Sequence, residues 1–168
     1  MLHRLLKTSG LILMMGLSLT VIAEDKTYEM LKWEQLIPAS AKQSVVSGYV
    51  EHDQYTGGDA PQAGAPVVTA LNGKDVKIAG FAVPLEGNDE GVTELLLVPF
   101  MGACVHVPPP PSNQIVYVKT QKPLSFDLIY DAFWVYGRLQ ASTFTSELAE
   151  AGYQLTADRF EAYVYDAQ

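Results

Sequence analysis

The residues most able to do chemistry in this sequence are Cys104 and His106, two positions apart. Cys104 is the only cysteine, and it lies between Gly102 and a run of four prolines, Pro108–Pro111. In an extended backbone alternate side chains share a face, so the sulfur and the imidazole could both point at one ion. Thiolate and imidazole suit zinc or copper. The spacing therefore predicts a transition-metal site.

Such a site needs donors from elsewhere in the chain. A structural zinc ion normally has four ligands, and this pair supplies only two. The remote candidates are His52, Glu51, Asp53 and the acids of residues 86–94. We take Cys104, His106 and His52 as the candidate ligands, with zinc or copper as the candidate ion.

Two other interpretations of the same residues stay open. In the first, His106 lowers the pKa of Cys104 and the thiolate acts as a nucleophile, with Asn113 or Gln114 orienting the histidine. In the second, Cys104 is a small buried hydrophobe, His106 is hydrogen-bonded, and the prolines form a rigid polyproline II segment or a surface for a partner. A non-enzymatic role is favoured over an enzymatic one, and no catalytic residue is assigned.

The first 23 residues predict export. Arg4 and Lys7 give a basic start, an apolar stretch runs from Leu11 to Ile22, and Ala23 ends a plausible cleavage site before the acidic Glu24. This is the three-part pattern of a secretory signal peptide. We therefore expect cleavage near Ala23, a periplasmic location and no membrane anchor after cleavage. A lone cysteine in an oxidising compartment is unusual, because it cannot form an internal disulfide.

The charge of the chain argues against one class of partner. There are 11 Lys and Arg residues against 19 Asp and Glu residues, a net charge of −8 that becomes −10 without residues 1–23. An acidic surface repels the phosphates of nucleic acid. We therefore expect no nucleic-acid partner.

The remaining residues, 24–168, are expected to form a single β-rich domain. Strands are predicted near residues 76–84, 94–99, 114–119, 131–139, 153–157 and 160–165. Gly80 and Gly137 should bend or bulge their strands, and Trp33–Pro38 and Ser146–Ala151 are typical of short helical turns. The order predicts a mainly β fold (α+β being the alternative), a small OB-like barrel of five or six strands with a short helical N-terminal segment.

Four stretches of the chain resemble one known family. They are Trp33–Pro38, Ile78–Glu86, Leu95–Phe100 and, above all, Gly102–Gln114 with its Cys-x-His-x-Pro-Pro-Pro-Pro element. In these stretches the chain resembles the bacterial domain-of-unknown-function family 3299. The resemblance implies an exported protein of Gram-negative bacteria without an assigned activity, whose genes often lie near ABC-type export or metal-uptake components. It carries over no catalytic residues.

These observations lead to one leading functional hypothesis and two alternatives. The leading hypothesis is a periplasmic transition-metal-binding or transporter-accessory protein that uses Cys104 and His106 and works beside an envelope transporter or another periplasmic protein. The first alternative is a non-enzymatic interaction module of the envelope with a structural Cys/His pair and a proline rod. The second is a cysteine-dependent enzyme.

Overall fold

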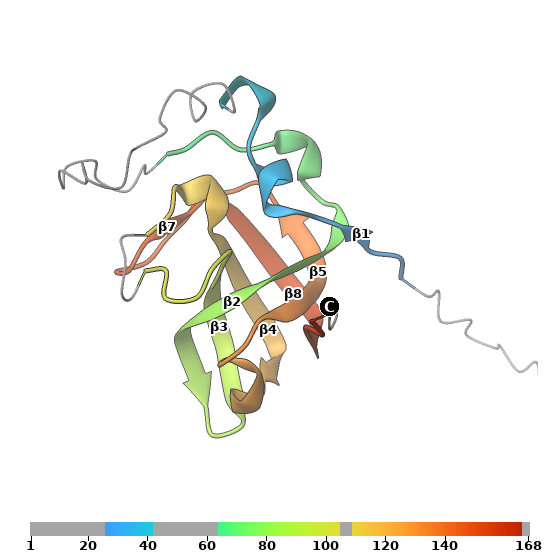
Figure 1. Cartoon of the computed structure of the whole chain (residues 1–168), viewed down its shortest axis with the longest axis vertical. Coiled ribbons are helices and arrows are strands. Elements are labelled where there is room, and N and C mark those ends of the chain that lie inside the picture. The colour runs from blue at the N-terminus through green and yellow to red at the C-terminus, as the bar shows by residue number, and fades with distance from the viewer. Residues whose placement is uncertain (1–25, 42–63, 105–108, 166–168) are drawn as a thin grey trace, which may run out of the picture.

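The computed structural model describes residues 26–41, 64–104 and 109–165 (Figure 1). Its strands are β1 (Glu29–Met30), β2 (Asp75–Asn88), β3 (Gly91–Val98), β4 (Val116–Leu124), β5 (Phe133–Gln140), β6 (Phe144–Thr145), β7 (Glu150–Ala151) and β8 (Tyr153–Ala162). Its 3-10 helices are η1 (Trp33–Leu36), η2 (Thr69–Leu71), η3 (Ser112–Gln114) and η4 (Phe126–Leu128). A further helical turn lies at residues 39–41.

Five strands close into a barrel in the order β2-β3-β4-β8-β5, with β5 pairing back to β2. Neighbours in the barrel are antiparallel, except that β4 and β8 run parallel. Three strands in a meander, with the fifth strand between the third and the fourth, form a Greek-key barrel of the OB type. The predicted mainly β barrel is therefore confirmed. β1 is the extra strand, and η1 is the short helical element expected near the N-terminus.

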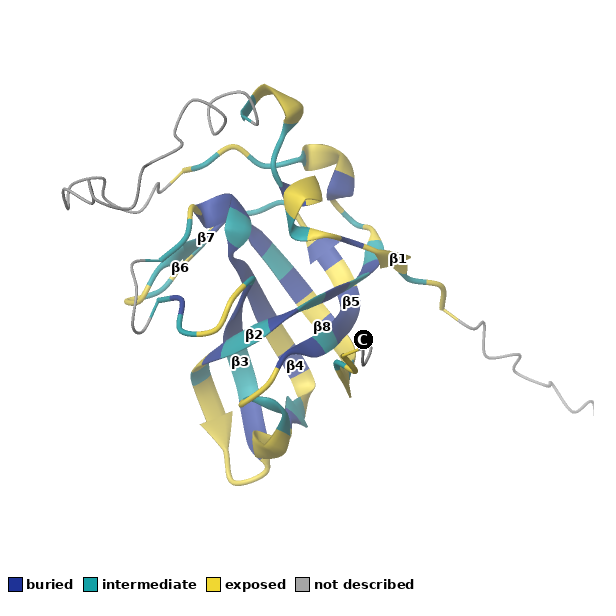
Figure 2. Cartoon of the chain, viewed as in Figure 1, coloured by how far each residue is buried: buried dark blue, intermediate teal, exposed yellow. Residues whose placement is uncertain are grey.

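The barrel interior is filled by one face of each strand. Apolar side chains that are at most 1% exposed fill it from every barrel strand: Val76, Ile78, Leu95, Leu97, Val116, Val118, Phe133, Val135 and Leu155. Figure 2 shows the buried stretches running along the strands, while the tip of the β2–β3 hairpin is exposed.

Two glycines let the strands follow this curvature, as the sequence predicted. Gly80 lies where β2 changes from pairing with β5 to pairing with β3, and a Cβ there would lie 2.7 Å from the carbonyl oxygen of Val98. The register of β5 against β8 shifts at Gly137. A Cβ on Gly137 would collide with the carbonyl oxygen of Thr156. A side chain at either position would force the strands apart.

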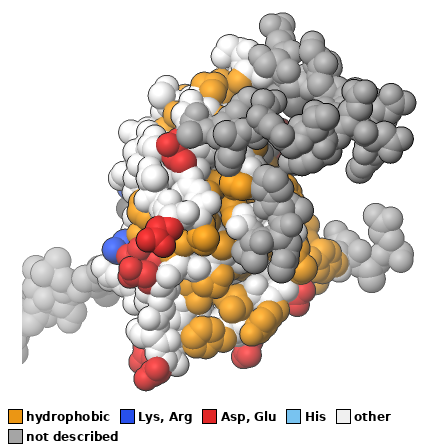
Figure 3. Space-filling view, turned by 90° about the vertical axis from the view of Figure 1, so that its left-hand side faces the viewer, with side chains coloured by type: hydrophobic (Ala, Val, Ile, Leu, Met, Phe, Trp, Pro, Cys, Tyr) orange, Lys and Arg blue, Asp and Glu red, His pale blue; other side chains and the backbone are white. Residues whose placement is uncertain are grey.

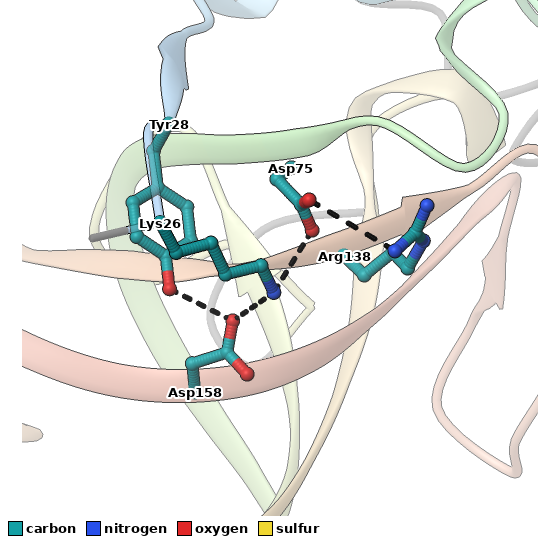
Figure 4. A network of polar contacts seen from close by, with 5 residues as sticks. All are labelled: Lys26, Tyr28, Asp75, Arg138 and Asp158. Carbon is teal, nitrogen blue, oxygen red and sulfur yellow. Dashed lines mark hydrogen bonds and ion pairs between the residues drawn. The ribbon is translucent and has the colours of Figure 1, made fainter. Parts of the chain in front are cut away.

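A polar network ties the segment before β1 to the barrel wall (Figure 4). The Lys26 ammonium lies 2.9 Å from a carboxylate oxygen of Asp75 on β2 and 2.7 Å from one of Asp158 on β8. The Tyr28 hydroxyl donates to the same Asp158 oxygen at 2.9 Å, and Arg138 lies 3.9 Å from Asp75. One cation therefore bridges two strands of the barrel.

Two of the expected elements differ in the structure. The segment Ser146–Ala151 is not helical: β6 and β7 pair as a small antiparallel hairpin, and Ser146 closes its turn by donating a hydrogen bond to the carbonyl oxygen of Ala149 at 2.9 Å. Six residues are too few to offset the cost of starting a helix, although Glu, Leu and Ala favour one. The two strands expected after Gly152 are one continuous strand, β8.

Candidate functional site

The outer face of β2, β3 and β4 carries a second apolar cluster. Residues that alternate with the barrel-filling ones point outward, yet Leu96 and Val98 are as fully buried as Leu95 and Leu97. We call it the outer cluster, and its buried members are Val83, Leu96, Val98, Ala103, Ile115, Tyr117 and Ala151. Half-buried side chains pack against it: Phe81, Leu85, Cys104, Phe144 and Ala149. The continuous apolar run of β3 thus belongs to a strand that is buried on both faces.

A hydrogen-bonded group borders the outer cluster on β3 and β4. The Tyr117 hydroxyl donates to one oxygen of Glu94 at 2.7 Å, and the Lys119 ammonium donates to the other at 2.6 Å. The bond from Lys119, together with that from Tyr117, lowers the pKa of Glu94. Burial, reinforced by the bond to Glu94, raises the pKa of Tyr117. At neutral pH this group is therefore a carboxylate held between a neutral phenol and a cation.

Cys104 lies at the edge of the outer cluster in an unusual backbone conformation. Its φ of 65° is the only positive value at a non-glycine residue among the described residues. L-residues adopt this left-handed conformation at a steric cost. The extended backbone that we assumed at Cys104 is therefore wrong, whereas the neighbouring Gly102, with φ 83°, has the conformational freedom that its type suggested. The side chain is half-buried, and burial raises the pKa of the thiol.

The other two predicted ligands, His106 and His52, lie outside the described residues. Within the described ranges, no three or more His, Cys, Asp or Glu side chains gather in a way that could hold a metal ion. The relation of the Cys104 sulfur to the two imidazoles therefore stays a prediction.

The segment that follows the prolines is a structural anchor. Ser112 and Asn113 are buried. The side-chain amide of Asn113 donates to the carbonyl oxygen of Pro66 at 2.9 Å, and that of Gln114 donates to the carbonyl oxygen of Trp33 at 3.0 Å. Both amides thus hold backbone segments that are distant in sequence. The relation of either amide to His106, which the nucleophile hypothesis requires, lies outside the described residues.

The loop between β3 and Cys104 exposes two large apolar side chains. Phe100 is 45% exposed and Met101 is 64% exposed, and both directly precede the left-handed stretch at Gly102 and Cys104. Figure 3 shows this side of the molecule, where hydrophobic side chains gather and acidic ones lie among and around them. Sequence reasoning singled out Gly102 and Cys104 but missed these two neighbours, which the apolar run continuing past β3 could have indicated.

No helix in the described part of the chain is both long enough and apolar enough to cross a membrane.

Comparison with known proteins agrees with this architecture. The family model described as "Protein of unknown function (DUF3299)" matches residues 33–162. The crystal structure of a DUF3299 family protein from Pseudomonas aeruginosa PAO1 is similar, with 40% sequence identity and a TM-score of 0.70, over 84% of this chain and 100% of that one. No protein with a curated description matches this chain. The matched span begins at Trp33 and includes the barrel, the outer cluster and Cys104.

Proposed function

We propose that this chain, which belongs to the DUF3299 family, is an exported, non-enzymatic binding module of the cell envelope that holds a partner protein at the apolar surface beside Cys104. The observation that carries the proposal is the exposure of Phe100 and Met101 in the short loop that joins Val98 and Ala103, two buried members of the outer cluster. Single exposed apolar residues are ordinary, but adjacent ones that continue a buried apolar cluster are typical of interaction sites.

The charge of the chain indicates the chemistry of the partner. The net charge is −8, and exposed acids flank the outer cluster at Glu86 on β2 and at Glu147 in the β6–β7 hairpin. Opposite charges steer association and fix orientation. The fitting partner is a protein segment that places an apolar side chain against Phe100 and Met101 and carries Lys or Arg beside it.

The state of the thiol favours binding over catalysis. Nucleophilic cysteines have a lowered pKa, because the thiolate is the reacting species. Burial of Cys104 acts in the opposite direction. In this proposal Cys104 contributes as a half-buried apolar side chain at the edge of the binding surface.

Site-specific photo-crosslinking in cells tests this proposal. A photoreactive phenylalanine analogue replaces Met101, and the control carries it at Tyr130, which is 74% exposed and follows η4. One discrete adduct should form at position 101 and none at position 130, and a second substitution, Phe100→Asp, should abolish the adduct. Equal adducts at both positions, or no adduct at position 101, would contradict the proposal.

Transition-metal binding is a second candidate function, supported by a half-buried sole thiol two positions before a histidine. Zinc or copper must displace the thiol proton, and the raised pKa of Cys104 makes this harder at low pH. Calorimetric titration with zinc, and with copper(I) under reducing conditions, compares wild type with Cys104→Ala and His106→Ala. Affinity should rise with pH and fall in both variants. Equal affinity in wild type and Cys104→Ala would eliminate this candidate.

A further inference from the structure

The segment between β5 and β8 crosses the outer cluster as a separate small hairpin. Its strands, β6 and β7, pair only with each other and join no strand of the barrel. It contributes Ala151 to the outer cluster, and its Phe144 and Ala149 pack against that cluster, while Leu148 near its turn is 46% exposed. The hairpin therefore rests on the barrel through side chains and not through a continuous sheet.

One aromatic contact dominates this attachment. The ring of Phe144 lies on the ring of Tyr117, with centroids 3.6 Å apart and planes 12° apart. Aromatic pairs prefer offset or edge-to-face arrangements over a close parallel sandwich, because the negative ring faces repel each other. The face-to-face contact is thus weaker than the same two rings would make in an offset pair.

Few polar bonds hold the hairpin at its ends. The amide nitrogen of Gly152 donates to the carbonyl oxygen of Ser112 at 2.7 Å, and the side chain of Gln154 donates to the carbonyl oxygen of Thr143 at 3.0 Å. Both bonds lie where the segment leaves or joins the barrel strands. Between these two ends, a further bond reaches the hairpin: the carboxylate of Glu150 on β7 accepts from the amide nitrogen of Gly64 at 2.5 Å. Opening of the hairpin must break this bond, whereas the two at its ends can stay.

The position of the hairpin gives it a function. In barrels of the OB type, ligands bind on the outer face of the second and third strands, beside the loop between the fourth and the fifth. Here the second and third strands are β3 and β4, and the loop is the segment that carries the hairpin. The face that binds ligands in such barrels is therefore covered by the chain itself, and the ring of Phe144 lies on the ring of Tyr117.

We propose that the β6–β7 hairpin is a lid, and that an aromatic side chain of the partner takes the place of Phe144 on Tyr117 when the lid opens. The partner's identity as a protein rests on the proposed function. The opening of the lid does not, since it is a property of the isolated chain. Phe144 shows the class of group that the site accepts, a planar apolar ring, and the Tyr117 hydroxyl stays bonded to Glu94 throughout.

The lone cysteine reports on the lid without engineering, because Cys104 packs against the same cluster as Phe144. Alkylation of Cys104 by iodoacetamide and amide hydrogen exchange are measured in wild type, in Phe144→Ala and in the control Phe126→Ala. Phe126 is a 46% exposed ring on η4. In Phe144→Ala, Cys104 labelling and exchange of the amides of residues 144–151 should accelerate several-fold, with β5 unchanged. Phe126→Ala should match wild type.

Two results would contradict the proposal that the hairpin is a lid. One is an unchanged rate in Phe144→Ala, and the other is acceleration by the same factor in the hairpin and in β5, which indicates global loosening. If Phe144→Ala does not fold, hydrogen exchange in the wild type alone tests the lid. The amides of residues 144–151 should then exchange faster than those of β4, and their exchange should depend less on urea. Equal protection of the hairpin and β4 contradicts the proposal.

The ligand class is tested with N-acetyl-L-tryptophanamide as the probe. In a nuclear magnetic resonance titration of Phe144→Ala, the amide signals of Leu96 and Tyr117 should shift at several-fold lower probe concentration than in wild type. Shifts confined to other residues would refute an aromatic site on Tyr117. A lid that opens while no adduct forms at Met101 rejects only the proposed function, whereas an adduct with a closed lid rejects only this inference.

Discussion

The indole nitrogen of Trp33 donates a 2.7 Å hydrogen bond to the carbonyl oxygen of Ala79 on β2. On the same edge of β2, the amide nitrogen of Leu31, the residue that follows β1, donates a hydrogen bond to the carbonyl oxygen of Lys77. Pairing of this edge with β3 begins only at Phe81. Trp33 therefore fills the gap in the ladder between β1 and β3. This role explains why one aromatic residue near the N-terminus matters to a barrel whose strands begin some 40 residues later.

Replacing Trp33 by phenylalanine should lower the free energy of unfolding by about 1 kcal/mol, the net worth of one hydrogen bond to a partly buried carbonyl. The measurement is urea denaturation followed by circular dichroism. The control is Trp134→Phe, at a half-buried indole on the outer face of β5 that packs on Tyr163. It removes the same atoms without removing a hydrogen bond to β2. Equal losses in the two variants would show that the bond contributes nothing beyond ring packing.

The ion pairs of Lys26 should make stability depend on pH in one direction. Burial of Asp158 opposes its ionisation, but hydrogen bonds from Lys26 and Tyr28 and the charge of Lys26 outweigh burial and lower the pKa of Asp158. A carboxylate with a lowered pKa stabilises the fold above its ordinary pKa of 3.8, and this contribution is lost as pH falls through the lowered value.

Lys26→Met should therefore cost about 1 kcal/mol at pH 7, because Lys26 and Asp158 are both more than a third exposed and Asp75 is 25% exposed. The difference from wild type should shrink toward zero as the pH falls below 3.8. Urea denaturation at pH 3 to 7 measures it, with Lys122→Met as a control at an exposed lysine on β4. A difference that stays constant across this range would exclude the network as its source.

The thiol of Cys104 should react slowly. Burial raises its pKa above the ordinary value of 9.0, so the thiolate fraction at pH 7 is lower than in a free thiol. The iodoacetamide labelling rate, measured against pH beside N-acetylcysteine, should rise with a midpoint above that of the small thiol. A midpoint below it would support the enzyme hypothesis, in which His106 activates the sulfur.

The barrel could be predicted from the sequence because its signals are local. Strand-like runs and the bending glycines Gly80 and Gly137 all act within a few residues. The β6–β7 hairpin could not be predicted, because its sequence favours a helix and only its contact with the outer cluster makes it extended. Tertiary packing overrides propensity in so short a segment.

The site was predicted in part. Cys104 was identified by type and spacing, but its left-handed backbone was not, because a cysteine, unlike Gly, Asn or Asp, does not indicate a positive φ by its type. The outer cluster had one visible signal, the run from Leu95 to Val98, in which residues of both faces are apolar. Residues 99–104 and 144–151 cover that face, and the closure of the barrel determines how they approach β3.

The most direct test of the central claim is the affinity of the crosslinked partner for purified wild type, Met101→Asp and Tyr130→Asp, measured by calorimetry. Met101→Asp should raise the Kd at least about tenfold, or about 1.4 kcal/mol, because the partner's apolar group would then be desolvated against a carboxylate. Tyr130→Asp should bind like wild type. An unchanged Kd for Met101→Asp, or an equal loss at Tyr130, would contradict a binding surface beside Cys104.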